Sequence, residues 1–288
     1  MKQFVKASRQ KCTMKLSIQG PSGSGKTLGA LKIAKGLTGS LKKVAVIDTE
    51  NGSSHLYSHL GGYSVLTMGA PFSPEKFIEA IQSGINAGFE CLIIDSLSHE
   101  WFGAGGILDV HSQMEGNSFT NWSKLTPRHN ALIQTIVNSP VHIITTLRSK
   151  TEYVIQQKNG KSIPEKVGMK AIQRDDSEYE FTIAFEVNKN HLATISKDRT
   201  NLFKNEVEFQ LTEVIGDKIK NWCSIDDAQI TSNVRQQVLN CNDLEELDRM
   251  MSENPEIVNV LREDVSIKTE DLILRNELKY RQNGSTHH

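Results

Sequence analysis

Residues 20–27 read Gly-Pro-Ser-Gly-Ser-Gly-Lys-Thr and fit the pattern G-x-x-x-x-G-K-[ST]. An alternating apolar segment with Met14, Leu16 and Ile18 precedes this stretch, and a helical pattern follows it from Leu28. A strand, a glycine-rich loop and a helix in this order form a phosphate-binding loop (P-loop), whose backbone N–H groups point inward at a phosphate. Because both flanks fit, we interpret the stretch as a nucleoside triphosphate site rather than a glycine-rich turn.

The loop itself supplies the predicted nucleotide-binding residues, which are Gly20, Pro21, Ser22, Gly23, Ser24, Gly25, Lys26 and Thr27. The helix that begins near Lys26 adds the positive end of its dipole to the site. Lys26 is expected to reach the β- and γ-phosphates, and the Thr27 hydroxyl to bind Mg²⁺.

Length and composition indicate a globular protein with one large domain and an appendage, or two modest domains: the chain has 288 residues, of which 38% are hydrophobic. Its cysteines, Cys12, Cys91, Cys223 and Cys241, form no C-x-x-C pair, so neither a disulfide framework nor a zinc ribbon is indicated. No apolar run approaches the roughly 18 residues that span a membrane, and the first residues lack the apolar segment of a secretory signal. We therefore expect a cytoplasmic protein without membrane contact.

Short apolar runs alternate with helical patterns along the first half of the chain. The runs Val44–Asp48, Cys91–Asp95 and Val141–Thr146 read as strands, and helical stretches cover Pro74–Ala87 and Lys124–Val137. Continuous apolar strands separated by helices indicate a mainly parallel sheet that is covered on both faces. The predicted class is α/β.

Two further strands, at Glu180–Val187 and Leu192–Ser196, complete the predicted core, which we assign to residues 1–223. The remaining pattern is helical and predicts a small C-terminal region at 224–282. The last residues, 283–288, read as a disordered tail.

Carboxylates stand at the ends of two predicted strands. In an open α/β sheet ligands bind outside the carboxyl ends of the strands, so Asp48, Glu50 and Asp95 are expected to face the same crevice as the P-loop. Asp95 has the form of the acid that holds Mg²⁺, and the alternative is a cap on the next helix. Glu50 is the candidate general base for an attacking water, and the alternative is a turn before a loop.

The kind of nucleotide follows from absent motifs. A GTPase pairs its P-loop with D-x-x-G and N-K-x-D, but here Asp95 is followed by Ser-Leu-Ser, and the only Asn-Lys pair stands in Asn188-Lys-Asn-His191. The guanine-reading aspartate is missing, so we predict ATP as the nucleotide and Mg²⁺ as its ion.

Positive charge is concentrated between Arg148 and Arg174, where seven basic residues face two acidic ones. A basic loop of this kind suits a surface that contacts nucleic acid, or a merely polar surface. It could also be the basic lid of a small-molecule kinase. Trp101 and Trp122 flank a glycine-rich loop and are candidates for stacking on unpaired bases, although buried or loop-anchoring tryptophans are the alternative.

The chain resembles the RecA-like ATPase core, and more narrowly a family of phage and prophage RecA-like ATPases with an AAA domain that are found beside single-strand annealing proteins. The resemblance covers residues 14 to 203. It rests on the P-loop, Ile47-Asp-Thr-Glu50, Leu92-Ile-Ile-Asp95 and Ser96-Leu-Ser-His-Glu-Trp101, and on Trp122-x-Lys-x-Thr-Pro127, Arg148-Ser-Lys-Thr-Glu-Tyr153 and Ser196-Lys-Asp-Arg199.

The resemblance implies a ring or filament with ATP between neighbouring subunits. By their place in the motif, Lys197 and Arg199 would then reach the γ-phosphate of the ATP bound by the adjacent subunit. The alternative is that both are solvated cations on the protein surface. The bacterial recombinase carries a glutamine as γ-phosphate sensor after the third strand. This chain departs from it, and leaves Thr146 and Arg148 as candidates.

The resemblance also implies a DNA-dependent ATPase that acts on single-stranded DNA in phage recombination or repair, with a single-strand annealing protein as a possible partner. The candidate DNA contacts are Lys150, Lys158, Lys161, Lys166, Lys170 and Arg174. An ATP-driven regulatory or signalling switch without DNA binding is the alternative, and a small-molecule kinase is the second.

Overall fold

The computed structural model of the protein describes residues 11–158, 161–174, 180–224, 227–253 and 261–284. Residues 12–223 form one compact unit, and the helices that follow Ser224 belong to a second. The first unit contains the P-loop and the sheet. That 1–223 and 224–282 are separate domains stays a prediction.

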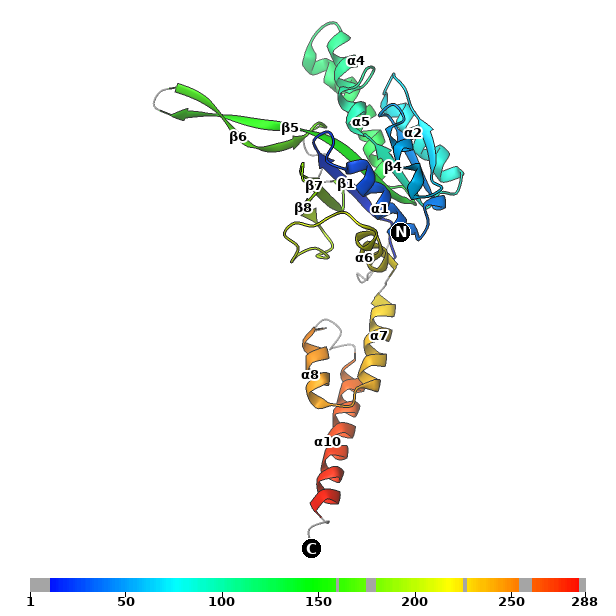
Figure 1. Cartoon of the computed structure of the whole chain (residues 1–288), viewed down its shortest axis with the longest axis vertical. Coiled ribbons are helices and arrows are strands. Elements are labelled where there is room, and N and C mark those ends of the chain that lie inside the picture. The colour runs from blue at the N-terminus through cyan, green and yellow to red at the C-terminus, as the bar shows by residue number, and fades with distance from the viewer. Residues whose placement is uncertain (1–10, 159–160, 175–179, 225–226, 254–260, 285–288) are drawn as a thin grey trace, which may run out of the picture. The chain divides into compact units, whose positions relative to one another are not determined.

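A single sheet of eight strands organises the first unit (Figure 1). The strands are β1 (Lys15–Gly20), β2 (Val44–Asp48), β3 (Ser64–Thr67), β4 (Cys91–Asp95), β5 (His142–Lys158), β6 (Lys161–Ala171), β7 (Ile183–Val187) and β8 (Ala193–Asp198). They pair in the order β3-β2-β4-β5-β1-β7-β8, with β6 paired to β5 outside this path. The pairs from β3 to β7 are parallel, and β5–β6 and β7–β8 are antiparallel. The predicted α/β class with a mainly parallel sheet is confirmed.

The central strands are buried on both faces, because successive side chains of a strand point to opposite sides. In β2, Val44 and Val46 join the apolar core on one face, whereas Ala45 and Ile47 join the core on the other. Strand β4 divides between the two cores in the same way. A strand buried on both faces reads as a continuous apolar run, and this is the pattern by which the sequence predicts both strands.

Helices cover both faces of the sheet. In this unit they are α1 (Lys26–Thr38), α2 (Pro74–Asn86), α3 (Ser98–Phe102), α4 (Ile107–Gln113), α5 (Ser118–Val137) and α6 (Glu213–Ser224), with 3₁₀ segments η1 (Leu41–Lys43) and η2 (Ser53–Leu60). Leu31 of α1 and Ile219 of α6 lie in one core. Phe77 of α2 and Leu132 of α5 lie in the other.

The predicted boundaries hold best where the strand is buried. β2 and β4 begin and end at the predicted residues, and α1 starts at Lys26. Helix α5 begins at Ser118, earlier than the predicted Lys124. Strand β3 was not predicted; it lies at the edge of the sheet and is largely exposed, so it lacks an apolar run.

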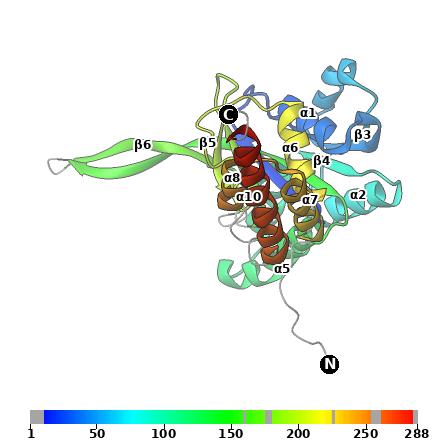
Figure 2. The same ribbon diagram turned by 90° about the horizontal axis from the view of Figure 1, so that it is seen from below.

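The basic segment 148–174 is a β-hairpin, and its description as a loop is wrong. Strand β5 continues past the sheet to Lys158, and β6 returns antiparallel from Lys161, with Ser149 opposite Ala171 at its base. In both views the hairpin extends away from the sheet as a two-stranded ribbon (Figures 1 and 2). The stretch lacks the long apolar run by which the core strands were recognised.

Helices α1 and α6 approach each other backbone to backbone. A Cβ at Gly36 would lie 2.1 Å from the Glu213 carbonyl oxygen and 2.8 Å from the Cα of Gly216. A Cβ at Gly216 would lie 2.1 Å from the Ile33 carbonyl oxygen. Both positions therefore require glycine for the two helices to pack at this distance.

Gly36→Ala should destabilise the protein, because α6 must move away from α1 to admit a methyl group. We expect a net loss of about 2 kcal/mol in the free energy of unfolding, since overpacking costs roughly 1–3 kcal/mol and removing a helical glycine returns less than about 1 kcal/mol. Urea denaturation followed by circular dichroism measures the loss. Gly69→Ala is the control, because a Cβ there meets no atom within 4 Å. Equal stability of the two variants would contradict this packing.

The second unit is helical and has a core of its own. The helices that the structure describes here are α7 (Asp227–Asn240), α8 (Leu244–Glu253) and α10 (Arg262–Gly284). Its buried apolar residues are Val234, Val238, Cys241, Leu247, Leu261 and Leu272. The sequence predicts a helix over 257–261, of which residues 257–260 lie outside the described residues, as do 285–288 of the predicted tail. Across the described helices, none combines the length and the apolar composition that crossing a lipid bilayer requires.

Candidate nucleotide-binding site

The P-loop lies between β1 and α1, as the sequence predicts. Gly23 and Gly25 have φ angles of 75° and 89°, in the left-handed region that favours glycine. A Cβ at Gly20 would lie 2.4 Å from the Val187 carbonyl oxygen, so glycine lets the loop pack against β7. The loop thus leads into the N-terminal end of α1, where backbone N–H groups and the helix dipole favour an anion.

Lys26 is held over the P-loop. Its ammonium donates a hydrogen bond to the Pro21 carbonyl at 2.8 Å. Burial lowers the pKa of Lys26 from its usual value, and the Asp95 and Glu50 carboxylates oppose this change. A bound phosphate would offer this partly desolvated cation a stronger acceptor than a neutral carbonyl.

Two hydroxyls from different elements meet at Asp95, the last residue of β4. Thr27 Oγ1 donates to Asp95 Oδ2 at 2.6 Å, and Thr146 Oγ1 of β5 donates to Oδ1. Asp95 is only 2% exposed. Burial raises the pKa of Asp95, while the hydrogen bonds from Thr146 and Thr27 lower it. Both carboxylate oxygens are thus engaged by hydroxyls of the P-loop helix and of β5 rather than by the first turn of α3.

Asp48 builds the turn that carries Glu50. The buried Asp48 carboxylate accepts hydrogen bonds from the backbone N–H groups of Glu50 at 2.8 Å, Gly52 at 3.2 Å and Ser54 at 2.8 Å. The turn is therefore made by the side chain of Asp48. The Glu50 carboxylate is left to contact other residues.

Glu50 and Arg148 form a bidentate ion pair. Arg148 Nε donates to Glu50 Oε1 at 2.7 Å, and its Nη2 donates to Oε2. The hydrogen bond to Glu50 raises the pKa of Arg148. The guanidinium also lies 5.9 Å from the ring centroid of Phe102. The sequence indicated both residues for the site but did not predict that they pair.

Sequence reasoning missed Thr49 and His99, which connect the ends of β2 and β4. Thr49 Oγ1 accepts a hydrogen bond from the Ser96 N–H at 2.8 Å. The same oxygen lies 3.1 Å from the Ser96 carbonyl oxygen and 2.7 Å from His99 Nδ1. The only signal for Thr49 was its place between two strand-end acids. These contacts fix the position of the Glu50 turn relative to Asp95.

An aromatic and basic groove lies where α3, α4 and α5 meet the base of the hairpin. Its volume is about 640 Å³, and its lining includes Trp101, Phe119, Trp122, Lys150, Lys170 and Arg174. The rings of Trp101 and Trp122 stack with centroids 5.8 Å apart. Phe119 is 86% exposed. The structure thus brings three of the six predicted DNA-contact residues together with both predicted tryptophans.

Buried polar contacts hold the wall of this groove. Glu100 is fully buried, and its carboxylate lies 3.0 Å from His129 Nδ1 of α5. Gln173, just after β6, donates to Glu100 at 3.3 Å and to the Leu97 carbonyl at 3.4 Å. Helix α3, helix α5 and the end of the hairpin are thereby joined behind Trp101.

The remaining candidate DNA contacts are spread along the hairpin. Lys158 ends β5, Lys161 begins β6, and Lys166 lies within β6 opposite Tyr153. Their side chains lie outside the described part of the structure. Nothing in the described geometry therefore brings them to the groove.

Lys197 and Arg199 lie away from the P-loop of their own chain. Lys197 pairs with Ala184, which pairs with Ser17, and the Arg199 N–H donates to the Thr182 carbonyl. These partners lie in the first half of β1 and near the start of β7, whereas the P-loop follows the carboxyl end of β1. The described contacts therefore do not bring Lys197 or Arg199 to the P-loop of their own chain.

A family model described as AAA domain matches residues 13–210, and the chain belongs to this family. The match spans the sheet, the P-loop and the residues around Asp95, so the protein is an AAA-type P-loop ATPase that binds ATP. No curated protein matches the chain.

Proposed function

We propose that this protein hydrolyses ATP at the P-loop and that single-stranded DNA stimulates the reaction. The observation that supports the catalytic part is the meeting of Thr27, Asp95 and Thr146 beside Lys26, with Glu50 and Arg148 at the same edge of the sheet. Phosphoryl transfer needs little more than positioned cations, an oriented water and a metal ion. These residues supply each of those roles.

The donors near the P-loop suit Mg²⁺, which prefers hard oxygen ligands. Thr27 Oγ1 and the Asp95 carboxylate are 2.6 Å apart and belong to the loop and to a strand end. Thr27 would bind the ion directly, Asp95 would hold it through water, and Thr146 keeps the Asp95 carboxylate oriented. Bound there, Mg²⁺ neutralises charge on the phosphates.

Glu50 is the proposed general base, and Arg148 is the proposed γ-phosphate sensor. In the pair with Arg148, both Glu50 carboxylate oxygens already accept hydrogen bonds from the guanidinium, so they are not open to an attacking water. A γ-phosphate would compete with Glu50 for Arg148, since guanidinium binds phosphate as well as carboxylate. Glu50 would thereby be released to take the proton of the attacking water when ATP is bound.

The aromatic and basic groove supports single-stranded DNA as the activator. Unpaired bases stack on aromatic rings, and basic side chains neutralise the backbone. Phe119 presents an exposed ring, Trp122 lies beside it in the lining, and Lys150 and Lys170 supply charge at the hairpin base. Strand β5 connects the groove to the catalytic site, because Arg148 is only two residues before Lys150.

Phe119→Ala should weaken binding to oligothymidylate by about 5- to 160-fold, since loss of one base–aromatic stack costs roughly 1–3 kcal/mol. Fluorescence titration measures this affinity. Val207→Ala is the matched control, because Val207 is also exposed and does not line the groove. Replacing both Lys150 and Lys170 by Ala should flatten the salt dependence by up to about 0.7 per lost phosphate contact. Wild-type affinity and salt slope in these variants would exclude the groove as the DNA site.

Self-association into a ring or filament is part of the proposal. Its support is the place of Lys197 and Arg199, whose backbone contacts lie away from the P-loop of their own chain and which would reach the γ-phosphate of a neighbouring subunit. A cation supplied in this way completes the site only on assembly. The same proposal places the protein in phage recombination or repair, in the bacterial or phage-infected host cytosol and with a single-strand annealing protein as partner.

A further inference from the structure

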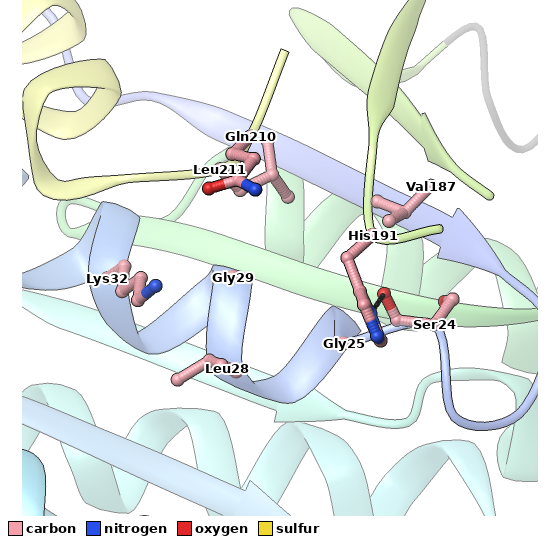
Figure 3. A pocket seen from close by; sticks show the side chains of 9 residues that line it. All are labelled: Ser24, Gly25, Leu28, Gly29, Lys32, Val187, His191, Gln210 and Leu211. Atoms are coloured by element: carbon pink, nitrogen blue, oxygen red, sulfur yellow. Dashed lines mark hydrogen bonds between the residues drawn. The ribbon is translucent and has the colours of Figure 1, made fainter. Parts of the chain in front are cut away.

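A second hollow, of about 220 Å³, opens at the P-loop between α1 and the segments on either side of β8 (Figure 3). Its lining includes Ser24, Gly25, Leu28, His191, Gln210 and Leu211. In Figure 3, His191 lies at the Gly25 end of the hollow, and Gln210 and Leu211 lie over Gly29. The hollow is therefore continuous with the loop that would hold the phosphates.

The location restricts what can occupy it. Phosphates bound by the loop N–H groups lie at the N-terminal end of α1, and the rest of a nucleotide must leave from there. The hollow begins at Ser24 and Gly25 and runs along α1 past Leu28. Its volume is below the roughly 300–1,000 Å³ of pockets for drug-sized ligands. A hollow of this size suits one flat, fused ring system.

His191 supplies a flat face at the entrance. Its Nδ1 lies 3.0 Å from the Ser24 carbonyl oxygen, and because a carbonyl only accepts, Nδ1 carries the proton in this contact. The turn that positions the ring is built by Asn188 Oδ1, which accepts from the N–H groups of Asn190 at 2.8 Å and Leu192 at 3.1 Å. The imidazole is exposed, so its face is open to stacking by a base.

Gln210 supplies a donor and an acceptor at the other side of the hollow. A glutamine amide forms a bidentate pair with adenine, accepting from the N6 amino group and donating to N7. Guanine presents two acceptors, O6 and N7, so the same amide can satisfy only one of them. The Gln210 side chain is exposed at the surface and Leu211 beside it is buried, which gives the site a polar rim and an apolar floor.

We propose that this hollow is the base subsite of the ATP site, in which His191 stacks on the adenine ring and Gln210 reads its N6–N7 edge. The inference rests on the proposed ATP site at the P-loop and assigns the residues that select ATP. Binding rather than turnover tests it, because the triphosphate and the base can be measured apart.

Calorimetric titration with ATP, GTP and inorganic tripolyphosphate, each with Mg²⁺, distinguishes the subsites. Wild-type protein should bind ATP about 5- to 10-fold more tightly than GTP, the low end of what one bidentate amide–adenine pair discriminates, since Gln210 is exposed. Gln210→Ala should lose this preference and keep tripolyphosphate affinity. Gln210→Lys should favour GTP, because an ammonium donates to guanine O6 and N7. His191→Ala should weaken ATP and GTP equally.

Asn205→Ala is the matched control, because it removes an exposed amide that does not line the hollow. An unchanged ATP-to-GTP ratio in both Gln210 variants would overturn the base subsite while leaving the P-loop assignment intact. If wild-type protein binds neither tripolyphosphate nor ATP, the proposed ATP site itself is overturned.

Discussion

Lys26→Ala should abolish ATP hydrolysis and weaken ATP binding. The ammonium is the cation of the P-loop itself, and its removal takes a fixed positive charge away from the β- and γ-phosphates. Steady-state turnover and calorimetric titration with ATP measure the two effects. The fold should be unaffected, since the hydrogen bond of the Lys26 ammonium is to the Pro21 carbonyl of the same loop.

Lys42→Ala is the matched control, because Lys42 is an exposed lysine of η1 outside the site. It should retain the turnover and the affinity of the wild type. Wild-type turnover in Lys26→Ala itself would overturn the P-loop assignment.

Glu50→Gln should retain ATP binding and lose turnover by about 100- to 10,000-fold, which is the usual contribution of a general base. A glutamine amide keeps the size of the side chain and can hold a water, but it does not accept the proton. Single-turnover hydrolysis with saturating ATP measures the loss without interference from binding.

Glu75→Gln is a close control, because Glu75 forms a bidentate pair with Arg128, at 2.7 and 2.8 Å, outside the site. Normal turnover is expected there. Normal turnover in Glu50→Gln would show that Glu50 is not the base.

Mixing Glu50→Gln subunits with Lys197→Ala subunits should restore some ATP turnover. A hybrid interface then pairs the intact Glu50 of one subunit with the intact Lys197 of its neighbour. No restoration would contradict the proposed site shared between subunits.

The parts of the fold that the sequence predicts well are those whose signal is local. The P-loop is recognised by one stretch, and β2 and β4 are continuous apolar runs because both of their faces are buried. The rule that strand ends line the binding crevice was enough to place Asp95 near Thr27. Thr146 was a candidate sensor, and in the structure it bonds to Asp95.

The pairing of Glu50 with Arg148 and the place of Gln210 depend on the order of the strands in the sheet. No local sequence pattern reveals that order. Glu50 and Arg148 are 98 residues apart and meet because β5 lies between β4 and β1, where Arg148 is level with Gly20. Gln210 reaches the P-loop helix only after the chain has passed β8. The hairpin was mistaken for a loop because a ribbon beyond the sheet needs no long apolar run.

The coupling of DNA binding to ATP hydrolysis is tested by measuring ATP turnover with different polynucleotides. ATP turnover is recorded with no polynucleotide, with single-stranded DNA, with duplex DNA and with RNA, at low and at moderate salt. We predict that single-stranded DNA raises turnover, that added salt reduces the stimulation, and that Phe119→Ala removes it while Val207→Ala does not. Turnover that is the same with and without every polynucleotide would contradict this coupling and favour an ATP-driven switch that does not use DNA.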